Sequence, residues 1–219
     1  MATRGRTGDG APASPPLRAD AARNRAQVLA AAREAFRESG TAAPLDEVAR
    51  RAGVNIATLY RRFPDRQALI RQVVVDAFTL VLDAARAAAD ASRADAPSAL
   101  ENFMMTLVHQ RDMLVLPLIG GPPISDDEVM ELQRGINTAL EELLDVARAD
   151  GTIRADVTGL DLITSAAMVC RPLPYLPVEE ATALATRHVR VFLDGLRPAV
   201  SRELPPGPTF EDFAAHLRQ

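Results

Sequence analysis

Four neighbouring residues carry side chains suited to contact with nucleic acid: Thr58, Tyr60, Arg61 and Arg62. Their hydroxyl and guanidinium groups donate hydrogen bonds to phosphate oxygens, and the planar groups among them also match base edges. One bidentate contact between arginine and guanine contributes ~1–3 kcal/mol of discrimination between bases. These residue types predict contact with double-stranded DNA, provided that a scaffold turns them outward.

Two short helices joined by a tight turn would position these side chains. Gly53 marks the turn, because glycine adopts a positive φ at little cost and commonly ends a helix. Asn55 follows as a suitable N-cap, whose side-chain oxygen accepts from the backbone amide of Ala57 or Thr58. The stretch 45–63 is therefore typical of a helix-turn-helix. Its inward side is predicted from apolar residues at helical spacing: Leu45, Val48, Ala49, Val54, Ala57 and Leu59.

A third helix before this pair would complete a small core. Residues 20–38 predict an amphipathic helix, with an apolar stripe of Val28, Leu29, Ala32, Ala35 and Phe36. Gly40 ends this segment, and Pro44 stands at the start of the next helix, where its missing amide costs nothing. Arg23 and Arg25 lie in the first turns, where basic side chains oppose the helix dipole. Either a nearby phosphate or a solvated surface would explain that placement.

One long helix is predicted after the pair. Pro64 ends the second short helix, because the residue before a proline is pushed out of the helical region, and Asp65 can cap the next helix. From Arg66 to about residue 91, apolar residues recur without a helix breaker, which gives a rod of about 39 Å at ~1.5 Å per residue. This rod would transmit movement from the second part of the chain to the first.

The elements Ala52-Gly53-Val54 and Thr58-Leu59-Tyr60-Arg61-Arg62-Phe63 are followed by Pro64 and by Ala68-Leu69. This arrangement resembles the DNA-binding region of the TetR (tetracycline repressor) family. The resemblance covers about 50 residues, from position 20 to position 69. Ile56 and Ala57 depart from the family, which commonly has Lys or Ser and Gly at these places. A phosphate contact sometimes made there is therefore lost, and Ile56 is suited only to touch a thymine methyl.

The resemblance also implies roles for individual residues. Thr58 and Tyr60 would contact backbone phosphates, while Arg61 and Arg62 would face bases or phosphates. Arg66 would close on the DNA backbone from the start of the long helix. The complete predicted DNA interface is Arg23, Arg25, Pro44, Asn55, Ile56, Ala57, Thr58, Tyr60, Arg61, Arg62 and Arg66.

The charge distribution agrees with this placement. Residues 1–75 contain 13 arginines and 7 acidic residues, whereas residues 76–219 contain 12 arginines and 22 acidic residues. The first third is therefore the part expected to meet a polyanion. Residues 1–17 are expected to form a disordered arm, because they are dominated by small residues and proline. Arg4 and Arg6 in that arm are suited to a minor groove, although an arm without DNA contacts is the simpler interpretation.

Other classes of protein are disfavoured. Cys170 is the only cysteine, which fits a reducing compartment, and a buried apolar role is a simpler interpretation of it than sensing of oxidants. No apolar leader or run of ~18 apolar residues is present, so the protein is expected to be cytoplasmic without a membrane partner. The histidines lack metal-ligand spacing, and neither a nucleophile motif nor a glycine-rich phosphate loop occurs. We therefore expect no metal, no cofactor and no enzyme activity.

The second part of the chain is predicted to be helical throughout. Apolar spacing predicts helices over 97–115, from a capping box of Ser125 and Glu128 to just before Gly151, from Asp156 or Thr158 to Cys170, and over 179–196. A short tail helix is predicted over 209–217, with Phe210 and Phe213 docking on an apolar surface.

The family resemblance implies that this part binds an effector and dimerises. A pocket between the middle helices would be lined by flexible apolar side chains and one polar anchor: Phe78, Met104, Met105, His109, Met113 and Met130. Each of these residues is equally suited to an ordinary core. The dimer interface would be formed by the last two long helices, through Leu160, Ile163, Ala167, Leu184, Val191 and Phe192.

The predicted fold is all-α. A three-helix helix-turn-helix domain, residues 18–65, is joined by the long helix to a helical effector-binding and dimerisation domain, residues 66–200, and a tail helix follows in 201–219. The predicted function is a ligand-responsive repressor that binds a palindromic operator as a homodimer. The alternatives are a helical small-molecule-binding protein or enzyme with a vestigial reading head, and an architectural DNA binder without an effector.

Overall fold

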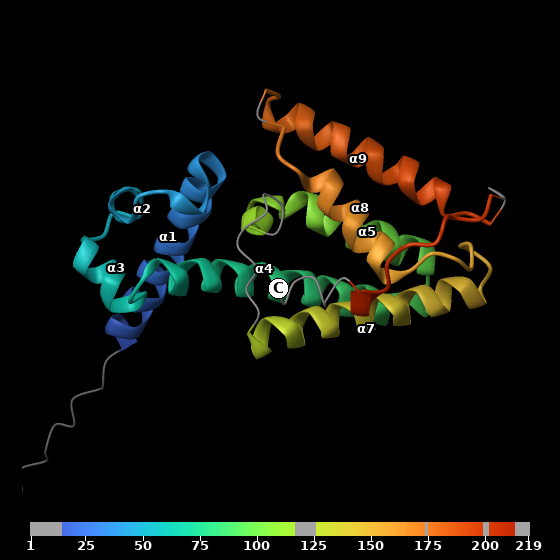
Figure 1. Cartoon of the computed structure of the whole chain (residues 1–219), viewed down its shortest axis with the longest axis horizontal. Helices are drawn as coiled ribbons and strands as arrows, with labels where there is room; N and C mark the ends of the chain where they lie inside the picture. Colours follow the sequence, from blue (N-terminus) through green and yellow to red (C-terminus); the bar gives the residue numbers. More distant parts are fainter. Residues whose placement is uncertain (1–14, 117–125, 174, 199–201, 213–219) are drawn as a thin grey trace, which may run out of the picture.

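The computed structural model describes residues 15–116, 126–173, 175–198 and 202–212. Within these ranges every regular element is helical, which confirms the predicted fold class. The molecule is elongated, with a small head at one end and a larger helical body at the other (Figure 1). The head contains α1 (Pro15–Ser39), the short 3-10 helix η1 (Gly40–Ala42), α2 (Leu45–Arg51) and α3 (Ile56–Arg62).

The head is held by one apolar core. Phe36 of α1, Val48 of α2 and Leu59 of α3 are completely buried in one apolar cluster between the three helices. Phe63, just after α3, is buried in the same cluster. Because each short helix has only one buried stripe, neither α2 nor α3 is stable without the others. The predicted three-helix core is therefore confirmed.

The first helix is longer than predicted. It begins at Pro15 rather than at position 20, and prolines in a first turn cost no hydrogen bond because the first amides have no partner within the helix. Residues 15–17, which the predicted disordered arm includes, are therefore helical, and residues 1–14 with Arg4 and Arg6 lie outside the described ranges.

The turn between α2 and α3 has the predicted conformation. Gly53 has a φ of 66°, and the side chain of Asn55 accepts a hydrogen bond of 2.9 Å from the amide of Ala57. One prediction is wrong, because Ala57 is exposed and does not belong to the inward side of α3. A helix of seven residues has room for one buried stripe, and Leu59 fills it while Val54 packs at its edge.

The long helix α4 (Arg66–Ser92) connects the head to the body, as predicted. Asp65 caps it by accepting from the amide of Ala68 at 2.7 Å. The first half of α4 contributes Leu69 and Val73 to the head core, and the second half contributes Ala77 and Ala85 to the body core. One continuous element thus belongs to both cores.

The body consists of α5 (Ala96–His109), the 3-10 helix η2 (Arg111–Leu114), α7 (Asp127–Ala149), α8 (Gly159–Cys170) and α9 (Val178–Gly195). α4 packs mainly against α7 and α5, and α9 packs on α5 and α8 (Figure 1). The predicted helix over 97–115 ends early, because the chain tightens into η2 after His109.

The caps of α7 and α8 are formed by side chains near their first residues. Asp126 caps α7 by accepting from the amide of Val129 at 2.9 Å. The predicted capping residue Ser125 is therefore wrong, and it lies outside the described ranges. Thr158, one of the two predicted starts, caps α8 in a reciprocal capping box with Asp161.

The two cores meet where the body reaches the head. Val115, Leu116 and Val129 come from the body but are buried in the head core, and Phe78 and Leu132 pack against both cores. Packed side chains of this kind resist independent sliding, because protein interiors leave few voids. A change in the position of α7 therefore also displaces side chains of the head core.

The described part of the C-terminal tail is attached to the α7–α8 connection. Asp156 forms a bidentate ion pair with Arg154 and accepts from the amide of Leu204 at 3.0 Å. The hydrogen bonds from Arg154 and Leu204 hold the pKa of Asp156 well below its usual range. The predicted tail helix is helical at Phe210, which is half-buried, while Phe213 lies outside the described ranges. Among the described helices none is long and apolar enough to cross a membrane.

Candidate nucleic-acid interface

The outer face of α3 carries the side chains predicted to meet DNA. Tyr60 is 48% exposed, and Arg61 and Arg62 are exposed beside it. Thr58 is half-buried, with its place on the helix set by the Asn55 cap one turn earlier. Ile56 packs at the margin of the head core, so little of its side chain is offered to a base.

A shallow depression next to α3 brings three predicted interface residues together. Pro44 of the α2 cap, Tyr60 of α3 and Arg66 of α4 line a hollow of about 450 Å³. Two acidic residues, Asp46 and Asp65, line the same hollow. The hollow is therefore less positive than the arginine-rich face of α3, where the phosphate contacts stay a prediction.

Arg66 forms hydrogen bonds to the backbone within the head. Its guanidinium Nη1 donates to the carbonyl oxygens of Thr41 at 2.9 Å and Ala43 at 2.5 Å. These carbonyls belong to η1 and the residue after it, where helix ends leave acceptors without intrahelical partners. Arg66 thus ties the start of α4 to the α1–α2 connection, and a further contact to DNA stays a prediction.

The arginines of α1 lie in different surroundings. The guanidinium carbon of Arg25 lies 5.6 Å from the centre of the Phe63 ring, a geometry typical of a cation–π contact. Arg25 is therefore held next to the last residue of the helix-turn-helix, and Arg23 is exposed in the turn before it. α1 thus brings positive charge to the side of α3.

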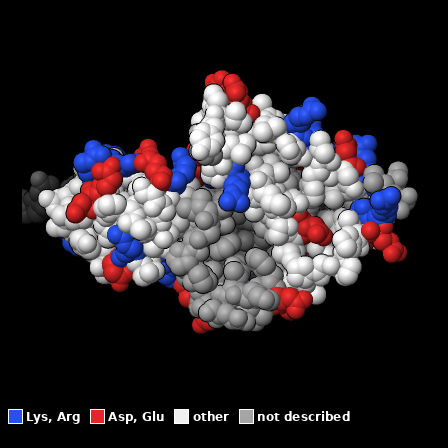
Figure 2. Space-filling view, turned by 45° about the horizontal axis from the view of Figure 1, so that its top comes forward, with Lys and Arg blue, Asp and Glu red and all other residues white. Residues whose placement is uncertain are grey.

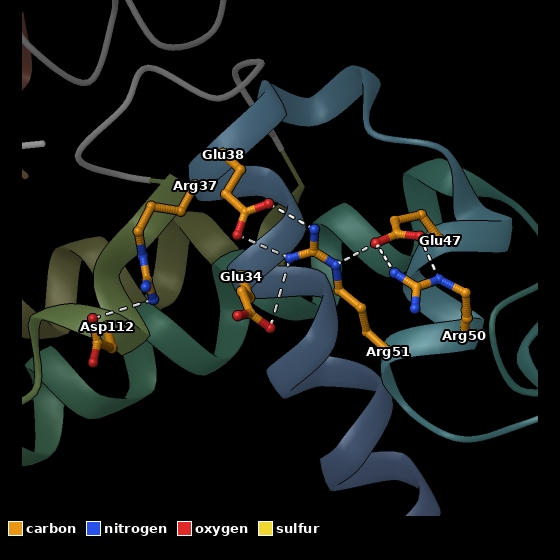
Figure 3. Close-up of polar contacts among 7 residues, drawn as sticks. All are labelled: Glu34, Arg37, Glu38, Glu47, Arg50, Arg51 and Asp112. Atoms are coloured by element: carbon orange, nitrogen blue, oxygen red, sulfur yellow. Dashed lines mark hydrogen bonds and ion pairs between the residues drawn. The ribbon is translucent and has the colours of Figure 1, made fainter.

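An ion-pair network fixes α2 on α1 (Figure 3). Arg51 donates to Glu38 at 2.6 and 3.0 Å and to Glu47 at 2.7 Å, and Glu34 lies 3.7 Å away. Glu47 also accepts from Arg50 at 2.6 and 2.8 Å. The hydrogen bonds from Arg50 and then Arg51 lower the pKa of Glu47 to about 2.

This network was not predicted from the sequence, although the spacing of Glu47, Arg50 and Arg51 indicates the part of it that lies within α2. Glu47 precedes Arg50 and Arg51 by three and four residues, which is the spacing at which helical side chains meet. The contact from Arg51 to Glu38 joins two helices, and spacing along the chain does not predict it. Figure 2 shows the result, with basic and acidic side chains side by side over the head.

The residues predicted to line an effector pocket do not share one surface. Met104 is completely buried in the body core, whereas His109 is exposed beyond it. Phe78, Met105, Met113 and Met130 are half-buried. None of these residues lines the hollow next to α3, and their role as a pocket stays a prediction.

The residues predicted for a dimer interface lie on α8 and α9. Ala167 and Val191 are exposed, Ile163, Leu184 and Phe192 are half-buried, and Leu160 is buried. The two helices pack on one another and leave apolar side chains uncovered, most clearly Val178 at 74%, Met168 at 70% and Val191 at 64% exposure.

Comparisons with known proteins agree with this geometry. A family profile described as "Bacterial regulatory proteins, tetR family" matches residues 28–73, and one described as "Transcriptional regulator SbtR-like, C-terminal domain" matches residues 95–198. The crystal structure of a TetR transcription regulatory protein from Mycobacterium vanbaalenii is 35% identical, covering 83% of this chain and 99% of that one, with a TM-score of 0.54.

The chain belongs to the TetR family. A second TetR regulator, SCO0520 from Streptomyces coelicolor, is 31% identical over 80% of this chain and 98% of that one, with a TM-score of 0.52. The TetR-like regulator LfrR from Mycobacterium smegmatis, crystallised with proflavine, shares the fold at 20% identity, covering 77% and 95% of the two chains, with a TM-score of 0.55. A comparison with curated proteins finds no significant match.

Membership of the TetR family makes this protein a DNA-binding transcriptional regulator. The resemblance found in the sequence is thereby confirmed, and the second profile extends it beyond the helix-turn-helix to the body. α3 is the second helix of the pair and carries its donors outward, and its role in reading DNA stays a prediction.

Proposed function

We propose that this TetR regulator is a ligand-responsive repressor that binds a palindromic operator as a homodimer. The observation that carries the proposal is the outward face of α3, where Tyr60, Arg61 and Arg62 are exposed on a helix of only seven residues. So short a helix reads few base pairs, and two copies related by two-fold symmetry read a palindromic site.

The uncovered apolar surface of α8 and α9 supports the homodimer. Among the described residues, most of the large hydrophobic side chains that are exposed lie on these helices and on their connection, including Met168, Tyr175, Val178 and Val191. Exposed patches of this kind mark interaction surfaces on otherwise soluble domains. A second copy would cover the same patch on both partners in an isologous contact.

The continuous helix α4 supports a response to a ligand. A ligand that binds the body more tightly in one position of α4 shifts the equilibrium toward that position and moves the head with it. The structure of the related regulator LfrR with proflavine supports this proposal, because it shows that a protein of the same fold holds a small molecule. In the repressor proposed here, the ligand would change the spacing of the two heads.

A mobility-shift experiment tests this function. The full chain is titrated at low salt onto labelled DNA from upstream of its own coding sequence, with unlabelled duplexes of the same sequence and of a scrambled sequence as the two competitors. The proposal predicts a discrete shift that the scrambled duplex does not compete away. Equal competition by both duplexes would favour an architectural DNA binder, and the absence of any shift at low salt would favour a helical small-molecule-binding protein.

A further inference from the structure

Two charged side chains extend the apolar stripes of α8 and α9. On α8, Arg171 follows Ala167 by four residues and is the C-cap of the helix. On α9, Glu180 stands four residues before Leu184 and eleven before Val191. Residues at such spacings lie on one face of a helix. Each stripe therefore ends in one charge, and the two charges have opposite signs.

Neither of these charges is neutralised within its own chain. Arg171 and Glu180 are both exposed, and among the described residues neither has an ion-pair partner. Other arginines of the body, Arg148, Arg154 and Arg197, each pair with a carboxylate of the same chain. Arg171 and Glu180 are therefore both available to a partner molecule.

A groove of about 830 Å³ adjoins Arg171. It is bounded by the end of α8, the connection to α9 and the start of α9, and Arg37 and Glu38 from the last turn of α1 line its other side. Met168 and Val178 line the groove and also belong to the apolar surface of the proposed homodimer. The groove is thus continuous with that surface, and a second copy that covers the surface also covers the groove.

The start of α9 is held in place by the rest of the body. Arg111 of η2 donates to the backbone carbonyl of Val178 at 3.1 Å. Glu179 and Glu180 lie in the first turn of α9, where acidic side chains interact favourably with the helix dipole. Glu180 is therefore presented from a fixed helix end, which lowers the cost of ordering it on association.

Two-fold symmetry brings the end of one α8 close to the start of the other α9. The α8–α9 connection lies at the end of the body nearest the head (Figure 1). In the proposed homodimer both heads face the same DNA, so the symmetry axis runs from the DNA between the heads and along the two bodies. The two connections then lie at one level along this axis. In a bundle of four helices, α9 of one subunit lies next to α8 of its partner.

We propose that Arg171 of each subunit forms an ion pair with Glu180 of the partner subunit, and that the partner's first turn of α9 covers the groove. This inference rests on the proposed function, because it names the residues by which the homodimer recognises a second copy. An isologous contact forms the pair twice. Charges around an apolar contact select the correct partner and fix the register of the contact. The two pairs therefore favour a second copy of this chain over other proteins with apolar helix faces.

The test uses mixed dimers of two charge-reversed chains. One full-length chain carries Arg171→Glu and the other carries Glu180→Arg, with tags of different mass. Homodimers of either variant bring like charges together at both proposed pairs, whereas the mixed dimer restores opposite charges at both. The matched control is a mixture of Arg134→Glu and Glu131→Arg, because both residues are exposed on α7, on the other side of the body from α9 (Figure 1). Thermal unfolding confirms that each variant keeps its fold.

Native mass spectrometry after subunit exchange measures the amounts of the three dimers. Random pairing makes about half of the dimers mixed, and the α7 control should stay near this distribution because its charges lie outside the contact. For the Arg171→Glu and Glu180→Arg mixture, the squared amount of mixed dimer divided by the product of the two homodimers should exceed its random value about tenfold or more. The reason is that every like-charge contact is replaced by an opposite-charge contact. The excess should shrink at about 1 M salt, where the screening length is only ~3 Å.

Random pairing of intact dimers would overturn the ion pair, leaving the homodimer in place and the groove open to another occupant. An excess equal to that of the α7 control, or one that does not respond to salt, would also overturn it, because neither reports a specific charge contact. So would the absence of mixed dimers at concentrations where the wild type dimerises. If the wild type itself is monomeric in sedimentation at every concentration, the proposed homodimer fails, which is a different result from random pairing.

Discussion

Arg66 Nη1 donates a hydrogen bond to the carbonyl oxygen of Thr41, 2.9 Å away, and so joins the first residue of α4 to the connection between α1 and α2. The same nitrogen also donates to the carbonyl of Ala43, which is a buried residue. The position of the helix-turn-helix relative to the long helix therefore depends on a side chain that family resemblance assigns to DNA contact.

Replacement of Arg66 by alanine should destabilise the protein. It removes both hydrogen bonds from a charged donor and leaves two carbonyls without a partner, which costs about 2 kcal/mol in total. Chemical denaturation followed by circular dichroism measures this loss, with Arg61→Ala as the control, because Arg61 is exposed. A loss of DNA affinity in Arg66→Ala without any loss of stability would show that Arg66 acts only through DNA.

Replacement of Arg61 by alanine should reduce discrimination between DNA sequences. A bidentate contact with guanine contributes ~1–3 kcal/mol, so affinity for the operator should fall about tenfold to a hundredfold, with a smaller loss for scrambled DNA. Fluorescence anisotropy with both duplexes at several salt concentrations measures the two losses. Equal losses on both duplexes would assign Arg61 to phosphate contact instead.

The stability of the head should depend on pH through Glu47. Its pKa falls from an ordinary value of 4.5 to about 2 in the folded protein, because Arg50 and Arg51 donate hydrogen bonds to it. A depressed carboxyl pKa stabilises the fold fully above about pH 4.5, and this contribution is lost as the pH falls toward 2. The denaturation midpoint of wild type should therefore fall more steeply across this window than that of Glu47→Gln. Parallel curves would contradict the role of the network.

Head and body should be coupled through Arg71. Its guanidinium pairs with Asp126, the cap of α7, and lies 2.6 Å from Glu128. A double-mutant cycle with Arg71→Gln and Asp126→Asn isolates the pair, because asparagine still caps a helix. We expect a coupling of about 0.5 kcal/mol in stability, as for a partly exposed pair. Additive effects of the two substitutions would remove Arg71 from the connection between head and body.

The helix-turn-helix could be predicted from the sequence because its determinants are local. Gly53 and Asn55 fix the turn through their own backbone and side chain, and the apolar spacing of α4 is uninterrupted from Leu69 to Ala88. Each of these signals lies within one or two helical turns. Local signals of this kind are what periodicity and capping rules detect.

The groove and the head network depend on contacts between distant segments, which no local rule predicts. Arg37 meets Asp112, and Arg51 meets Glu38, across separate helices. The sequence instead pointed to Met104 and His109 as pocket residues, but helical spacing alone did not distinguish the core from a cavity wall. The structure buries the first and exposes the second.

A footprint on the regulator's own upstream DNA tests most directly whether this protein is a dimeric operator-binding regulator. Hydroxyl-radical cleavage is recorded along both strands at saturating protein, with Arg61→Ala as the comparison. We predict two protected half-sites related by two-fold symmetry and separated by one helical turn or a multiple of it, about 34–36 Å per turn. A single unpaired half-site, or no protection at a concentration that shifts the duplex, would contradict the homodimeric repressor.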